Sequence, residues 1–183
     1  MRILCTGNPT RGITYQLSTI LPDIDFISRS NGYDLTTIEG IDKFKEIISN
    51  YNIFINHSQL IPGVQCELLT IAHESWDYGQ VINIGSILEL EEWAWYDTET
   101  HIDKNKLKKL SINLNSERFK STHLTVGGLA KDNTNDNQRL SSLQVANVIK
   151  YIIDSNIHIP LMQIENTNDE LIRHYQHIKN QRK

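Results

Sequence analysis

The sequence is poor in cysteine and proline and has no long apolar run. Its two cysteines, Cys5 and Cys66, stand in apolar surroundings without metal-ligand spacing, which predicts reduced core residues and no metal site. No apolar run approaches the roughly 20 residues that a membrane helix needs. The first residues have the pattern of a strand and lack that of a signal peptide. We therefore expect a cytoplasmic protein with no membrane partner.

An excess of positive charge is also lacking. The 183 residues carry a net charge of −4, which gives no general basic field and predicts no nucleic-acid partner. The hydrophobic share of 39% suits a single globular domain over residues 1–183, with room for a core. Within it, residues 166–183 are charged and predict a C-terminal helix or tail.

What the chain does have is a regular alternation of short apolar runs with helical periodicity. The apolar runs predict strands at residues 3–5, 24–27, 33–35, 53–55, 81–84, 124–126 and 159–164. Apolar residues at helical spacing predict helices at 13–21, 38–50, 62–76, 104–114 and 142–153. This alternation predicts an α/β fold with a doubly wound, mostly parallel, Rossmann-like sheet in three layers, α/β/α.

Local signals sharpen three of these boundaries. Thr36 and Glu39 have the spacing of a capping box at the start of the second helix. Pro160 predicts that the last strand lies near a sheet edge, because proline cannot donate to a ladder on both sides. The polar stretch 131–137 predicts a surface loop.

A glycine turn joins the first strand to the first helix. Thr6 and Gly7 end the apolar run, and Gly12 and Ile13 begin the helical one. Such a turn leaves backbone N–H groups free at a helix N-terminus, where the helix dipole favours an anion. A phosphate site is one interpretation. The other is steric, because glycine is common wherever a strand turns sharply into a helix.

Polar residues and glycines follow the predicted strands. In a doubly wound sheet, ligands bind beyond the carboxyl ends of the strands. The residues at these ends are Gly7, Arg29, Asp34, Asn56, Ser86 and Gly127. A full row of this kind favours a crevice for a dinucleotide.

In its order of motifs the chain resembles the short-chain dehydrogenase/reductase family over roughly residues 1–165. Residues 6–13, Thr-Gly-Asn-Pro-Thr-Arg-Gly-Ile, are similar to the family's Thr-Gly-x-x-x-Gly-x-Gly turn, with one extra residue between the glycines. Thr14 replaces the last glycine, which predicts looser packing of the first helix on the sheet. The resemblance implies a nicotinamide dinucleotide bound by this turn, through Gly7, Thr10, Arg11, Gly12 and Ile13.

Two arginines bear on the choice of cofactor. Arg11 and Arg29 stand where NADPH-preferring members carry basic residues, whose guanidinium groups can pair with a 2′-phosphate. No acid ends the second strand to bind a free ribose hydroxyl. The resemblance thus implies NADP(H) in preference to NAD(H), and the alternative for both arginines is solvated charge. Asp34 and Leu35 resemble the family's Asp-Val pair beside the adenine.

Two further strand ends resemble cofactor-binding motifs of the family. Residues 56–59, Asn-His-Ser-Gln, resemble its Asn-Asn-Ala-Gly motif, which implies that Asn56, His57 and Ser58 lie beside the cofactor. A plain strand-ending asparagine is the alternative. Gly127 begins a Gly-Gly pair where the family has Pro-Gly, and it is carried over as a cofactor contact.

The catalytic residues carry over with one departure. Residues 81–86, Val-Ile-Asn-Ile-Gly-Ser, resemble the strand that leads to the family's catalytic serine, so Ser86 would hydrogen-bond a substrate oxygen. Lys104 stands at the lysine position, where the resemblance implies that it binds the nicotinamide ribose and lowers the pKa of the catalytic tyrosine. Thr100 occupies the place of that tyrosine, which transfers the proton in the family. Tyr96 is the candidate replacement acid. The alternatives are a solvated position for Lys104 and, for Tyr96, a surface aromatic that covers the crevice or contacts a partner.

Three functions are compatible with these residues. The first is an NADP(H)-dependent oxidoreductase acting on a small carbonyl or alcohol, for which the resemblance implies a homodimer through the helices at 62–76 and 104–114. The second is a dinucleotide-binding or scaffold protein that has lost the catalytic tyrosine. The third is a sugar-nucleotide enzyme of the family's extended branch, which the short C-terminal part disfavours.

Overall fold

The computed structural model describes residues 1–58, 60–91, 94, 97–130, 139–155 and 157–165. The loop expected at 131–137, the tail expected at 166–183 and Tyr96 lie outside the described residues. Among the described helices, none is long and apolar enough to cross a membrane.

Six parallel strands form a single sheet in the described part of the chain. The strands are β1 (Ile3–Thr6), β2 (Ile24–Ile27), β3 (Ile53–Asn56), β4 (Gly79–Ile84), β5 (Phe119–Val126) and β6 (Leu161–Ile164). The helices between them are α1 (Gly12–Ile20), α2 (Ile38–Ile48), α3 (Val64–Ser75), α4 (Thr98–Asn113) and α5 (Ser142–Asp154). The strand order is β2-β1-β3-β4-β5-β6, and each neighbouring pair is parallel. The doubly wound sheet is confirmed, and so is the edge position of the strand that follows Pro160.

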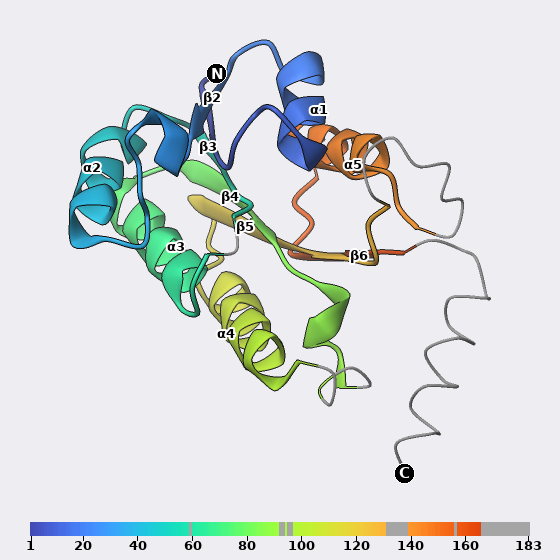
Figure 1. Cartoon of the computed structure of the whole chain (residues 1–183). Helices are drawn as coiled ribbons and strands as arrows, with labels where there is room; N and C mark the ends of the chain where they lie inside the picture. The colour runs from blue at the N-terminus through green and yellow to red at the C-terminus, as the bar shows by residue number, and fades with distance from the viewer. Residues whose placement is uncertain (59, 92–93, 95–96, 131–138, 156, 166–183) are drawn as a thin grey trace, which may run out of the picture.

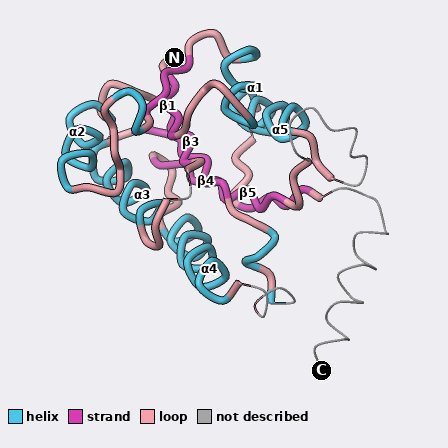
Figure 2. Tube along the Cα trace, in the orientation of Figure 1, coloured by secondary structure: helices cyan, strands magenta, loops and turns pink. Residues whose placement is uncertain are grey.

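Helices cover both faces of this sheet. Helices α1 and α5 pack together on one face, and α2, α3 and α4 lie side by side on the other (Figure 1). The magenta strands of Figure 2 run between the two helical layers. Alternate side chains of a strand serve different layers: Ile3 and Cys5 belong to the core beneath α1 and α5, and Leu4 to the core beneath α2 and α3. Continuous apolar runs are therefore what such strands require.

Capping side chains fix where three helices begin. Thr37 accepts a hydrogen bond from the Gly40 amide at 3.1 Å, so Thr37 caps α2 and the capping box expected from Thr36 and Glu39 is wrong by one residue. Ser141 and Gln144 form a reciprocal capping box at α5. Asp97 caps α4 by accepting from the Thr100 amide at 3.0 Å.

The strand expected at residues 33–35 is absent from the described structure. After β2 the chain makes a 3₁₀ turn (Arg29–Asn31) and then a loop. The Asp34 carboxylate accepts from the Thr36 amide at 3.2 Å and the Thr36 hydroxyl at 2.6 Å, which bends the backbone away from an extended course. Short aspartate-containing runs favour such turns over a strand.

Strand β5 begins five residues earlier than its apolar run indicates. Its first half contains Ser121, Thr122 and His123, which are polar and yet fully buried. Ser121 and His123 are accommodated by buried hydrogen bonds to residues of other elements, which hydrophobic periodicity does not record.

The order of the strands reverses between β1 and β3. From β1 the chain winds outward to β2, and it then crosses back to place β3 on the other side of β1. Crossover connections leave the sheet in opposite directions at such a point, and a crevice opens between the carboxyl ends of the two strands. The fold thus predicts where a ligand pocket lies.

Candidate functional site

A pocket of about 540 Å³ lies at this reversal point. Its wall includes nine of the residues predicted to bind the cofactor: Gly7, Arg11, Gly12, Ile13, Arg29, Asp34, Leu35, His57 and Ser58. Seven further lining residues were not predicted: Asn8, Thr14, Ile27, Ser28, Tyr33, Leu60 and Leu129. Most of these adjoin predicted residues in the sequence, whereas Leu60 and Leu129 reach the pocket only through the folding of their loops.

Gly7 forms a narrow cradle at the base of the pocket. Its φ of +130° lies in the region that favours glycine. A Cβ at this position would stand 2.8 Å from the Thr14 methyl carbon and 3.2 Å from His57 Nδ1. Only glycine fits here, and its small size opens the backbone of the turn to a ligand.

Thr14 stands where the resembled motif has its last glycine. The residue is buried, and its hydroxyl donates to the Arg11 carbonyl at 2.9 Å and also to the Asn8 carbonyl. Its methyl group packs directly against Gly7. The Thr14 hydroxyl therefore ties the first turn of α1 to the loop before it. This brings the Thr14 methyl group close to Gly7, although threonine is larger than the glycine of the resembled motif.

Thr6 links the ends of β1 and β3, a role that the sequence pattern did not reveal. Its hydroxyl oxygen accepts hydrogen bonds from the His57 and Ser58 amides, each at 2.9 Å. These two bonds turn the chain after β3 toward the pocket. The loop that carries His57 and Ser58 is thereby fixed to the glycine turn.

His57 is half-buried in the pocket wall and its ring has a distinctive environment. Its Nδ1 atom is buried and has no hydrogen-bond partner among the described residues. Burial, with a smaller contribution from the charge of Lys104, lowers the pKa of His57 to about 4. The imidazole is accordingly neutral at pH 7.

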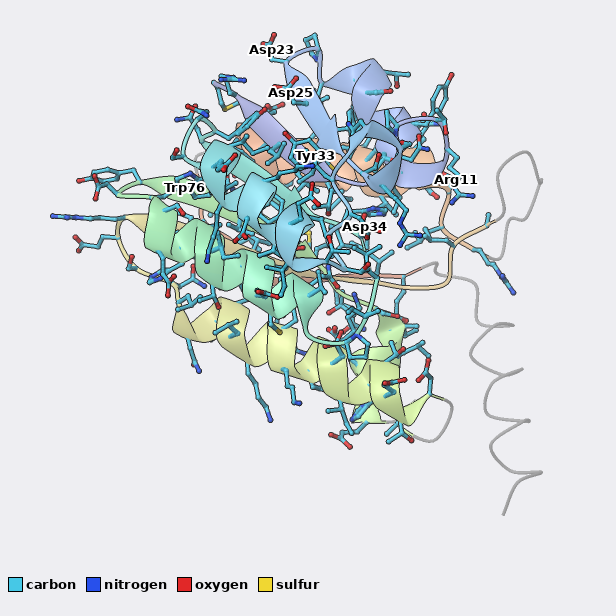
Figure 3. All side chains as sticks on the ribbon, turned by 60° about the vertical axis from the view of Figure 1, so that its left-hand side comes forward. Arg11, Asp23, Asp25, Tyr33, Asp34 and Trp76 are labelled. Atoms are coloured by element: carbon cyan, nitrogen blue, oxygen red, sulfur yellow. The ribbon has the colours of Figure 1, made fainter. Side chains whose placement is uncertain are left out.

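Arg29 and Asp34 form an ion pair at the mouth of the pocket. Arg29 Nε lies 2.9 Å from Asp34 Oδ2, and the arginine side chain remains 70% exposed. Hydrogen bonds from the Thr36 hydroxyl and amide, with Arg29 adding less, hold the pKa of Asp34 below its usual value. Figure 3 shows Arg11 and Asp34 on the right-hand side of the view, away from Asp23 and Trp76. Two cationic side chains thus stand on one side of the molecule at the pocket.

The N-terminus of α1 faces the same pocket. Arg11 is its N-cap residue, the Arg11 side chain makes no capping hydrogen bond, and the first turn contains no acid. The positive end of the helix dipole is therefore not offset by a side chain of its own turn. An anion in the pocket meets this dipole and the two guanidinium groups together.

Four residues expected at the cofactor lie outside the pocket wall, namely Thr10, Asn56, Gly127 and Lys104. Thr10 is exposed on the turn, where its amide donates to Asn8 Oδ1 at 3.0 Å. Asn56 is fully buried below the pocket and donates to the Gln65 carbonyl at 2.8 Å. A Cβ at Gly127 would stand 3.2 Å from the backbone of Glu165, so packing between neighbouring chain segments explains this glycine.

Ser86 follows β4 and Lys104 bonds to the last residue of that strand, and both lie outside the pocket wall. The Ser86 hydroxyl oxygen accepts from the Leu88 amide at 3.2 Å and caps the 3₁₀ helix Ile87–Glu89. Lys104 is only 2% exposed, which rules out the solvated position considered for it. Its ammonium donates to Gln65 Oε1 and, at 3.2 Å, to the Ile84 carbonyl. Burial lowers the pKa of Lys104 to about 8.

Thr100, at the tyrosine position of the resembled motif, is part of the N-terminal cap of α4. The Thr100 hydroxyl donates to Asp97 Oδ2 at 2.7 Å, and the Thr100 amide donates to the other carboxylate oxygen. Tyr96, the candidate replacement acid, is not among the described residues. Within the described part of the chain, no group of three or more His, Cys, Asp or Glu side chains could hold a metal ion.

Comparisons with known proteins agree with this architecture. No protein-family model matches the sequence, and no curated protein matches it as a relative. Among solved structures, the chain is similar to the 3-alpha-hydroxysteroid dehydrogenase of a Pseudomonas species, complexed with NADH, at 13% identity and a TM-score of 0.72. That match covers 95% of this chain and 99% of the other.

Two further structures contain the phosphorylated cofactor. A short-chain dehydrogenase from Burkholderia cenocepacia, in complex with NADP, has 12% identity, a TM-score of 0.70 and coverage of 99% of both chains. One from Sphingobium yanoikuyae, in complex with NADPH, has 11% identity, a TM-score of 0.71 and coverage of 98% of this chain and 96% of the other. At these identities the likeness shows the fold: the chain has a short-chain dehydrogenase/reductase-like Rossmann fold.

Proposed function

We propose that the chain is an NADP(H)-dependent oxidoreductase that binds its cofactor in the pocket between β1 and β3. The observation that carries the proposal is the cradle at Gly7, which a Cβ would fill and which faces the N-terminus of α1. A pyrophosphate needs close backbone approach and a helix dipole, and this turn offers both. The solved structures with the same fold that hold NADH, NADP or NADPH support the same interpretation.

The preference for the 2′-phosphorylated cofactor rests on Arg29 and Arg11. The Asp34 carboxylate is fixed by Thr36 and holds the guanidinium of Arg29 at the pocket mouth. An exposed ion pair of this kind is worth little, so a phosphate can compete for the guanidinium. Guanidinium groups bind phosphate oxygens through paired, charge-assisted hydrogen bonds.

The chemistry that we propose is reduction or oxidation of a small carbonyl or alcohol. A nicotinamide cofactor supplies or accepts a hydride when bound. Ser86 would donate its hydroxyl hydrogen to the substrate oxygen, since its oxygen already accepts from Leu88. Lys104, buried beside the same strand end, would place a positive charge near the site, and Tyr96 or a water would supply the proton.

A second candidate is a dinucleotide-binding protein without turnover. The observation that favours it is the state of Thr100 and Lys104: the first is engaged in capping α4, and the ammonium of the second donates to Gln65 and Ile84. Neither arrangement impairs the pocket at Gly7. Binding and catalysis can thus be tested apart.

The first experiment is a calorimetric titration of the chain with NADPH and with NADH, followed by turnover assays with a panel of aldehydes and ketones. We expect NADPH to bind more tightly than NADH. Binding accompanied by substrate-dependent oxidation of NADPH supports the oxidoreductase, and binding without turnover supports the second candidate. If neither cofactor binds, both candidates are wrong.

The second experiment substitutes Arg29. We expect Arg29→Ala to weaken NADPH binding about 10- to 100-fold, from the about 1.5–3 kcal/mol of a charged hydrogen bond, and to leave NADH binding nearly unchanged. Arg2→Ala is the matched control, because Arg2 also forms an exposed ion pair with an aspartate, Asp25, at 3.3 Å. Equal losses for both cofactors would remove the argument for NADP(H).

We further propose that the chain forms a homodimer through α3 and α4. The outer face of α4 exposes Ile102 and Ile112, which are 48% and 44% accessible. It also exposes Lys106 and Lys109, so the contact would be of mixed character.

A further inference from the structure

A buried acid lies behind the turn that carries Ser86. The side chains of Glu89, at the end of the 3₁₀ helix, and of His123, on β5, both have an exposed fraction of 0%. Glu89 Oε2 lies 2.8 Å from His123 Nε2, and Glu89 Oε1 accepts from the Thr125 hydroxyl. Lys108, on α4, has its ammonium 3.8 Å from the same carboxylate.

The carboxylate in this cluster is ionised and engaged on both oxygens. Burial pushes the pKa of Glu89 up, but hydrogen bonds from His123, Thr125 and the Ser86 amide outweigh it and hold the pKa below its usual value. His123 Nδ1 is buried without a partner among the described residues, so the ring N–H is placed on Nε2, from which it donates a hydrogen bond to Glu89. A buried acid with three donors has one stable orientation.

This acid is connected directly to Ser86. The Ser86 amide donates to Glu89 Oε2 at 3.4 Å, and the Glu89 amide donates to the Ser86 carbonyl at 3.0 Å. The Ser86 oxygen in turn accepts from Leu88. The Ser86 hydroxyl hydrogen has no acceptor among the described residues. The direction in which this hydrogen points is therefore set by the two bonds that hold the Ser86 amide and hydroxyl oxygen in the turn.

Gly85 is the residue that permits this arrangement. A Cβ at this position would stand 2.4 Å from His123 Nε2 and 2.6 Å from Glu89 Oε2. Any other residue would push the hydrogen-bonded pair of Glu89 and His123 away from the strand end. The glycine before Ser86 thus serves the buried pair beneath the turn.

Helix α4 holds the same 3₁₀ helix from its other side. Asn105 Nδ2 donates to the Glu89 carbonyl at 2.7 Å, and His101 Nδ1 lies 3.0 Å from the Leu88 carbonyl. Glu89 is therefore held through its backbone by α4 and through its side chain by β5.

We propose that Glu89, held by His123 and Thr125, is a positioning residue for Ser86. It anchors the Ser86 amide from below and thereby fixes the direction in which the Ser86 hydroxyl hydrogen can be donated. This inference rests on the proposed function, in which that hydrogen binds the substrate oxygen. Glu89 acts through Ser86 and touches neither substrate nor cofactor.

Glu89→Gln tests the role, because it keeps the volume and replaces one acceptor oxygen with an NH₂ donor. The substituted amide cannot accept from Ser86, His123 and Thr125 together. We expect kcat to fall at least tenfold while the Kd for NADPH is unchanged. Thr125→Val is the milder second variant, with a smaller loss in the same direction. Glu67→Gln, at an exposed position of α3, is the matched control and should change neither quantity.

A double-mutant cycle with Ser86→Ala separates positioning from a general structural effect. If Glu89 acts through Ser86, Glu89→Gln has no further effect on kcat in the Ser86→Ala background. An equal fold-loss in both backgrounds would overturn the proposal. So would an unchanged kcat in both Glu89→Gln and Thr125→Val.

Native-state hydrogen exchange decides the question even if the wild-type chain shows no turnover, in which case the proposed oxidoreductase fails separately. We expect Glu89→Gln and Thr125→Val to speed exchange of the Ser86 and Leu88 amides at least tenfold, with the amide of Leu68 in α3 unchanged. Unchanged exchange at Ser86 and Leu88, or a uniform rise throughout the chain, would overturn the positioning role.

Discussion

Single residues decide the shape of the pocket, and Gly7 and Thr14 show how. The sequence pattern predicts looser packing of α1 because Thr14 replaces a glycine. In the structure the Thr14 methyl packs against Gly7, and its hydroxyl bonds to the carbonyls of Asn8 and Arg11. Gly7 alone therefore allows the close approach of β1 and α1, because the opposing Thr14 also bonds to the loop between them.

The first prediction concerns this approach. Gly7→Ala should lower Tm by several degrees and abolish measurable NADPH binding, because the new methyl group meets Thr14 and the φ of +130° disfavours an L-residue. Gly63→Ala is the control: it has a φ of +89° but open space around the Cβ. The control should lose about 1 kcal/mol of stability and keep full binding. Equal effects of the two substitutions would show that the contact with Thr14 is unimportant.

The second prediction concerns the pH dependence of stability contributed by His57. The folded chain holds its pKa near 4, below the unfolded value of about 6.5, so the unfolded state binds more protons between these values. The contribution is fully present above pH 6.5 and is lost as the pH falls toward 4. The loss of stability relative to pH 7.5 should reach about 2 kcal/mol at pH 5.

Urea denaturation of wild type and His57→Gln at pH 7.5 and pH 5 measures this contribution. The difference in unfolding free energy between the two proteins should shift by about 2 kcal/mol in favour of the variant at pH 5. A constant difference between wild type and His57→Gln at both pH values contradicts the prediction.

Between elements, polar side chains make connections that the apolar core does not. Thr6 joins β1 to the loop after β3, and Asn56 and Asn83 join β3 to β4 at 3.0 Å. Asn83 also donates to Ser111 on α4 and to Ser121 on β5. These bonds lie inside the protein, where a satisfied polar network fixes the relative positions of strands and helices.

The third prediction tests one such connection. Thr6→Val should destabilise the chain by about 1–3 kcal/mol and weaken NADPH binding, because the amides of His57 and Ser58 lose their acceptor. The matched control is Thr122→Val. Thr122 is equally buried, but its hydroxyl has no partner among the described residues. Chemical denaturation should show the control to be neutral or stabilising. Destabilisation of both variants by the same amount would contradict the assignment.

At the scale of the whole molecule, the reversal of strand order places the pocket. Among the described helices, two cover one face of the sheet and three the other, and the sheet separates two apolar cores. The pocket lies where the crossovers diverge, at the carboxyl ends of β1 and β3. Helix α4 carries the exposed Ile102 and Ile112, at the contact that we propose for a second copy.

The fourth prediction concerns assembly. Light scattering after size exclusion should give twice the chain mass of 21.1 kDa. Ile102→Glu should return the mass to that of one chain, because it places a charge in the proposed contact. Ile38→Glu, at an 83% exposed position of α2, should leave the dimer intact. A single-chain mass for the wild type at all concentrations would exclude the homodimer.

Local sequence patterns predicted the α/β class, five of the six described strands to within two residues at either end, and nine of the sixteen residues of the pocket wall. Continuous apolar runs and helical periodicity are local signals, and a glycine turn after a strand has a local cause in backbone sterics. Arg29 could be expected at the pocket because parallel strands all end at the same edge of the sheet, and Arg11 because it lies beside Gly12 in the glycine turn.

Whether each polar residue is buried or exposed depends on partners that the tertiary fold brings to it. Lys104 stands in a lysine-rich stretch and yet is buried, because the Gln65 side-chain oxygen and the Ile84 carbonyl accept hydrogen bonds from its ammonium. His123 can belong to β5, outside the apolar run, because Glu89, 34 residues away, accepts a hydrogen bond from its ring. A buried polar group is stable only if its partner is present, and that partner comes from another element. A local pattern cannot say which distant residue will be that partner. The apolar pattern therefore predicts the strands and helices, whereas long-range hydrogen bonds determine which polar side chains are buried at the candidate site.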